Sequence, residues 1–97
     1  MDCKGCKVRS SRRTEVKGKT VRVDKCMVDI VNTINEYTLY ETLGCCCGHG
    51  IYPMSIVVRD KSGYKFDLMS GKEVPRKTRY YVTDDKGFYY IPEIISI

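Results

Sequence analysis

The chain has 97 residues, a formal net charge of +5, six cysteines and one histidine. This length fits one domain with a modest core, and no apolar run is long enough to cross a membrane. The charge is concentrated at the start, because residues 1–25 hold nine Lys/Arg against three Asp/Glu, whereas residues 26–97 hold eight against nine. We therefore expect a single domain over 1–97, with a basic part at 1–23 and the main body at 24–97.

The cysteines favour metal binding over a disulfide framework. Six is an even number, which fits disulfides superficially, but three of the six are adjacent and lie beside the only histidine. The polar, charged start of the chain also lacks the pattern of a signal peptide. We therefore expect a reducing compartment, the cytoplasm, which is the host cytoplasm if the protein is viral.

The first motif is a CxxC pair, Cys3 and Cys6, with Gly5 in its bend. A four-residue segment of this kind can close as a metal knuckle. A second Cys/His cluster later in the chain strengthens this interpretation. A thioredoxin-like redox role fits less well, because no strand precedes the motif. Two free thiols in a disordered N-terminus remain the plain alternative.

A basic, β-patterned stretch follows the CxxC pair. Residues 9–13 are predicted to be a loop, and alternating residues at 14–16 and 20–23 predict a hairpin around Gly18. Basic residues in this arm can contact nucleic-acid phosphates. The candidates are Arg12, Arg13, Lys17 and Lys19. The alternative is a solvated surface whose positive charge also offsets thiolates around a metal.

Apolar residues at helical spacing predict a helix over 24–36, with Asp24 as its N-cap. Residues 38–43 then favour a strand, which leads directly into the cysteine cluster. A short connection makes the helix and strand antiparallel neighbours. The end of the strand should therefore lie beside the first turn of the helix, which places Cys26 near residues 45–49. Cys26 as a small core residue is the alternative.

The central motif is Cys45-Cys46-Cys47-Gly48-His49-Gly50. Thiolate and imidazole are preferred zinc ligands, and the glycines permit a tight turn around the histidine. We predict one Zn²⁺ ion between this turn and the N-terminal knuckle. The first-choice ligands are Cys3, Cys6, Cys47 and His49, with Cys26 and Cys46 as substitutes. Small buried residues or a reactive thiol are the alternatives.

The remainder of the chain predicts antiparallel strands. Alternating segments at 55–59 and 64–68 flank one turn, and segments at 79–83 and 88–91 flank a second turn that ends in glycine. The overall prediction is an α+β fold, in which one main helix packs on an antiparallel β-meander and a zinc-knuckle-like hairpin precedes it.

The stretch 23–58 resembles a group of small, mostly uncharacterised proteins of phages, prophages and prokaryotes. The shared pattern is Asp-x-Cys, an amphipathic helix with Asn near its end, and Thr-x-x-(Ser/Cys)-Cys-Cys-Gly-His-Gly. The matching residues are Asp24, Cys26, Asn35, Thr42, Cys45, Cys46, Cys47, Gly48, His49 and Gly50. The resemblance implies that Cys26 belongs with Cys46, Cys47 and His49. It demotes Cys45, because serine is frequent at that position in the pattern.

Three functions compete at this point. The first is a small zinc-binding protein with a structural metal and a partner that is either nucleic acid or protein. The second is an enzyme that uses the cluster of Cys46, Cys47 and His49 as a thiolate nucleophile or as zinc ligands that activate water. The third is a viral or prophage accessory protein that acts on a host protein by surface contact. No zinc-hydrolase motif accompanies the cluster, so we favour a non-enzymatic role.

Overall fold

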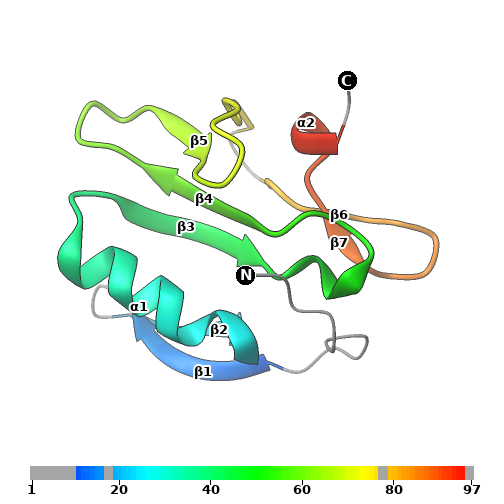
Figure 1. The fold of residues 1–97 in the computed structure, drawn as a ribbon, viewed down its shortest axis with the longest axis horizontal. Helices are drawn as coiled ribbons and strands as arrows, with labels where there is room; N and C mark the ends of the chain where they lie inside the picture. The colour runs from blue at the N-terminus through cyan, green and yellow to red at the C-terminus, as the bar shows by residue number, and fades with distance from the viewer. Residues whose placement is uncertain (1–10, 17–18, 77–78, 96–97) are drawn as a thin grey trace.

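The computed structural model describes residues 11–16, 19–76 and 79–95. In chain order the elements are β1 (Ser11–Val16), β2 (Lys19–Asp24), a 3₁₀ turn (Lys25–Met27), α1 (Val28–Tyr37), β3 (Glu41–Cys46), a second 3₁₀ turn (Gly48–Gly50), β4 (Ser55–Arg59), β5 (Lys65–Asp67), β6 (Val82–Thr83), β7 (Tyr89–Tyr90) and α2 (Pro92–Ile95) (Figure 1). Within these ranges, β3, β4 and β5 form an antiparallel sheet with β4 central, and β1–β2 and β6–β7 are separate antiparallel pairs. The α+β class, with one main helix beside an antiparallel sheet, is confirmed for the described residues.

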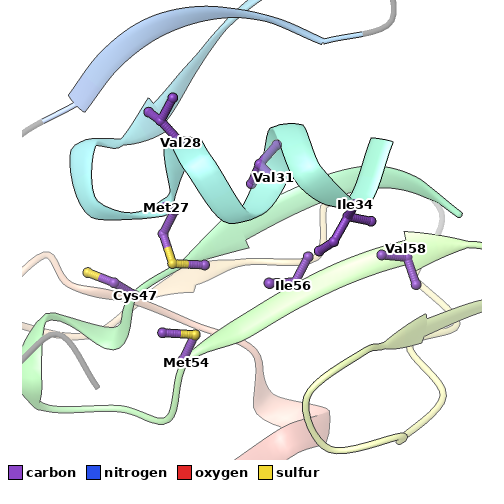
Figure 2. Packing of buried hydrophobic residues seen from close by; sticks show 8 residues of the cluster. All are labelled: Met27, Val28, Val31, Ile34, Cys47, Met54, Ile56 and Val58. Atoms are coloured by element: carbon purple, nitrogen blue, oxygen red, sulfur yellow. The ribbon is translucent and has the colours of Figure 1, made fainter. Parts of the chain in front are cut away.

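The main core lies between α1 and the sheet. Val28, Val31 and Ile34 form the apolar stripe of the helix, and all three are buried. They pack with Ile56 and Val58 of β4, as Figure 2 shows. Each such side chain contributes roughly 1.5–3 kcal/mol when it is fully buried. The burial of this stripe explains why a ten-residue helix is stable here.

Strand β4 is buried on both faces. Ile56 and Val58 point into the core under α1, whereas Val57 belongs to a second cluster with Val74 and Ile91. This alternation follows from the two-residue period of a strand. The second cluster attaches the C-terminal part of the chain to the face of the sheet opposite the helix.

Strand β3 begins three residues later than predicted, at Glu41 instead of residue 38. The Asn35 side chain accounts for this shift, because its amide nitrogen donates to Oγ1 of Thr42 at 2.8 Å and its oxygen accepts from the Thr42 N–H at 3.2 Å. This bridge sets where the strand starts along the helix. Strand β3 therefore runs through Cys45 and ends at Cys46, so both cysteines lie in the strand itself.

The predicted N-terminal hairpin is present as β1 paired with β2, with Val16 opposite Lys19. Residues 9–13 were predicted to be a loop, and this is wrong for residues 11–13, because β1 begins at Ser11. The predicted zinc knuckle at Cys3 and Cys6 lies outside the described residues.

The later strands are shorter than predicted. Strand β5 pairs with β4, as expected for the first hairpin of the meander. The second predicted hairpin forms β6 and β7, but these two-residue strands pair only with each other in the described part of the chain. Among the described residues, no helix combines the length and the apolar character needed to span a bilayer.

Candidate metal centre

The path of the chain brings the end of β3 beside the segment that precedes α1. Strand β3 runs back along the helix, so its last residues reach the start of the helical segment (Figure 1). There the backbone N–H of Cys47 donates a hydrogen bond to Oδ2 of Asp24 at 3.1 Å. The junction between β2 and α1 is thereby joined to the cysteine cluster, although more than twenty residues separate the two segments in sequence.

The turn after β3 has an unusual backbone. Gly48, His49 and Gly50 have φ values of 83°, 52° and 76°, so three consecutive residues lie in the left-handed region. Glycine adopts this conformation without steric cost, whereas histidine does so with some strain. Within the described residues, His49 is the single non-glycine residue with positive φ. The turn thus holds the imidazole in a position that an ordinary turn would not provide.

Gly48→Ala is expected to destabilise the protein by about 2–3 kcal/mol. A Cβ atom on Gly48 would lie 3.2 Å from the carbonyl carbon and oxygen of Pro53, in addition to the strain of a positive φ. Gly63→Ala is the matched control, because Gly63 has a φ of 91° but its Cβ would meet no atom within 4 Å. Urea unfolding of both variants tests this, and equal losses would show that the contact with Pro53 is unimportant.

His49 lies buried between Cys47 and Asp24. Its side chain is almost fully enclosed, and the residue is 2% exposed. Nδ1 lies 3.9 Å from Sγ of Cys47, and Nε2 lies 3.8 Å from Oδ2 of Asp24. When one ring nitrogen of a histidine binds a metal, the other usually donates to a supporting group. Asp24 and Cys47 face opposite nitrogens of the ring, so either one can share an ion with His49 while the other supports the ring.

Asp24, Cys46 and His49 each offer one ligand atom, and these three atoms lie within 4.8 Å of one another. Tetrahedral zinc with bonds of about 2.0–2.3 Å needs neighbouring ligand atoms about 3.3–3.8 Å apart. The atoms therefore have to approach by no more than about 1.5 Å to hold an ion. A carboxylate, a thiolate and an imidazole together are typical zinc donors and are a poor set for Mg²⁺ or Ca²⁺.

The thiols at the site are weakly acidic without a cation. Burial is the main cause that raises the pKa of Cys46 to about 11 and that of Cys47 to about 12. The Asp24 carboxylate adds to both shifts, and a hydrogen bond with Cys26 adds to that of Cys47. At neutral pH and without an ion these groups are thiols, which are poor nucleophiles. A divalent cation would favour the thiolate forms.

Four of the six predicted ligands lie in the described part of the chain, namely Cys26, Cys46, Cys47 and His49. Cys47 and His49 of the first-choice set lie together, whereas Cys3 and Cys6 of that set lie outside the described residues. Cys26 lies in the 3₁₀ turn after Asp24 and contacts Cys47 through the hydrogen bond described above.

Cys46 and Cys45 lie on different sides of the sheet, as adjacent strand residues should. Sγ of Cys46 accepts a hydrogen bond from the Gly48 N–H at 3.4 Å, and it lies 3.9 Å from the carbonyl oxygen of Tyr89. Cys45 packs against the core under α1, together with Cys47. Burial raises the pKa of Cys45 to about 12, with a further contribution from Asp24.

Asp24 is a candidate ligand that sequence reasoning assigned to a different role. It was predicted to be the N-cap of the helix, and it does precede the 3₁₀ turn. Its side chain makes no capping hydrogen bond there, and it accepts from Cys47 instead. The Asp-x-Cys spacing was the available indication, because it places Asp24 and Cys26 at the same end of the helix.

The candidate nucleic-acid residues belong to the N-terminal hairpin. Arg12 and Arg13 lie in β1, opposite Val23 and Arg22, and Lys19 lies in β2, opposite Val16. Lys17 lies outside the described residues.

No family model, curated protein or solved structure matches this chain.

Proposed function

We propose that the protein is a small zinc-binding protein in which one ion has a structural role and the folded surface binds a partner. The convergence of Asp24, Cys46 and His49 carries this proposal. Cys26 and Cys47 are not part of this convergent group, but both lie beside it, and one of the two would supply the fourth ligand. The site is then complete within residues 24–49, without the N-terminal CxxC pair.

The surroundings of these residues support a structural role over a catalytic one. Cys46 and His49 are 4% and 2% exposed, so two of the ligands are shielded from water. Four protein ligands fill the tetrahedral positions of zinc and leave none for a substrate or a reactive water. A closed site of this kind stabilises the fold by linking its segments.

Metal analysis of the purified protein tests the proposal. Elemental analysis should give one zinc per chain. Replacement of zinc by Co²⁺ should produce thiolate-to-cobalt absorption and the visible bands of a tetrahedral site. These bands should not change when azide or cyanide is added, because no open position remains. A folded protein that takes up neither metal would overturn the proposal.

For the partner, we propose single-stranded nucleic acid bound by the basic N-terminal arm. The excess of positive charge in residues 1–25 supports this. The resemblance to phage and prophage proteins supports an accessory role in an infected cell. In that role, a host protein is the alternative to nucleic acid as the partner.

Binding of a labelled single-stranded oligonucleotide should weaken steeply with salt if this partner is correct. Log K should fall linearly with log salt, with a slope of about 0.7 per phosphate contact for single strands. The double variant Arg12→Ala/Arg13→Ala should reduce the slope by about 1.4, whereas Lys61→Ala, in the exposed turn after β4, should not change it. Fluorescence anisotropy measures these slopes. Binding that is absent or independent of salt would favour a protein partner.

A further inference from the structure

The C-terminal hairpin, residues 82–90, is a small element that needs support from its surroundings. Strands β6 and β7 have two residues each, and a two-stranded hairpin is marginally stable in water by itself. Its turn is ordered internally, because the Asp84 carboxylate accepts hydrogen bonds from the backbone N–H groups of Lys86 and Phe88, both at 2.9 Å. The position of the hairpin therefore depends on the residues that it packs against.

Two of its residues contact the candidate metal centre directly. The ring of Phe88 lies against the imidazole of His49, with their centroids 5.7 Å apart. The carbonyl oxygen of Tyr89 lies 3.9 Å from Sγ of Cys46. The hairpin thus reaches two of the three convergent ligand residues.

A third contact is made by Tyr52, which follows the 3₁₀ turn at Gly48–Gly50. The hydroxyl of Tyr52 donates a hydrogen bond to Oδ2 of Asp84 at 2.7 Å, and its ring stacks on that of Tyr90 with a centroid distance of 4.9 Å. Tyr52 also donates its backbone N–H to the carbonyl of Gly48 at 3.0 Å, so its position is tied to the turn. The hairpin therefore contacts the metal loop, residues 46–52, both before and after His49.

We infer that the hairpin 82–90 is a lid on the metal centre, which holds the metal loop in its ligand-binding shape and slows release of the ion. This inference rests on the proposed zinc site. The loop has three consecutive positive φ values, and both the ion and the hairpin favour that one conformation. Two partners that stabilise the same conformation must strengthen each other's binding. Zinc should therefore order the hairpin, and the hairpin should retain zinc.

Zinc release into an excess of a chromogenic chelator tests the lid. Phe88→Ala removes the ring that covers His49. It should speed release by about 10–100-fold, because loss of groups that support metal ligands typically lowers metal affinity by that factor. Tyr64→Ala is the matched control. Tyr64 is an aromatic residue just before β5, and its ring stacks on that of Phe66 with a centroid distance of 5.4 Å. Its release rate should stay close to that of the parent protein. Hydrogen exchange of residues 84–90 should also accelerate when zinc is removed.

A second variant keeps the inference testable if Phe88→Ala does not fold. Tyr52→Phe retains the stacked ring and removes only the hydrogen bond to Asp84, and it too should release zinc faster than the parent. Parent-like release from every variant that folds would overturn the lid and leave the zinc site intact. A parent protein that carries no zinc would overturn the site and the lid together, so the two failures are distinguishable.

Discussion

Removal of zinc with a chelator is expected to lower the unfolding temperature by roughly 15–30 °C. An ion held at about a thousand times its Kd stabilises the folded state by about 4 kcal/mol, and each kcal/mol shifts the midpoint by roughly 4–8 °C in a domain of this size. The effect should be large because an ion bound by Asp24 and Cys46 would join the start of the helical segment to the end of β3. Circular dichroism during heating measures it.

Chelator that has been saturated with zinc beforehand is the control, and it should leave the midpoint unchanged. Addition of zinc after chelation should restore the original curve, because the ligands are still present. A midpoint that does not respond to chelation would contradict a structural role even if zinc were found in the purified protein.

The second large effect is expected from Cys46→Ala, which should abolish stoichiometric zinc binding. Cys45→Ala is a matched control, because both residues lie in β3 and each substitution removes one sulfur atom. Only Cys46 belongs to the group of convergent ligand atoms, whereas Cys45 packs against the core. The control should therefore keep one zinc per chain and lose only about 1 kcal/mol of stability.

Asp24→Asn extends this comparison to the carboxylate. The substitution keeps the size of the side chain and an oxygen that can accept the hydrogen bond from Cys47. Zinc affinity should still fall, because an amide is a weaker zinc ligand than a carboxylate. Competition with a chelator of known affinity measures all three variants, and equal affinities for Cys46→Ala and Cys45→Ala would remove Cys46 from the ligand set.

The helix and the central strands could be predicted because their patterns are local. The apolar stripe of α1 and the apolar run of β4 each indicate burial before any packing is known. The start of β3 could not be predicted in this way. It depends on the side chain of Asn35 reaching Thr42, a tertiary contact that strand propensity does not include.

The candidate site was predicted in part for the same reason. Cys46, Cys47 and His49 are close in sequence, and antiparallel packing of β3 on α1 predicts that Cys26 is near them. The part played by Asp24 depends on which of two hydrogen-bond donors its carboxylate faces. The carboxylate could accept a hydrogen bond either from the N–H groups of the following helical turn or from the N–H of Cys47. The structure shows the bond from Cys47. Sequence distance carries no information about that choice.

The distance along the chain between Asp24 and Cys46 has a consequence for the unfolded protein. An ion bound by both residues closes a loop of about 22 residues, and so acts as a reversible cross-link. A covalent bridge across a loop of this length removes chain entropy worth about 3 kcal/mol at 25 °C. The cysteines of 45–47 and His49 can bind zinc locally before that loop closes, so early metal binding during folding would occupy ligands without forming the cross-link. Zinc supplied after β3 has docked on α1 should therefore give faster and more complete refolding than zinc supplied to the unfolded chain.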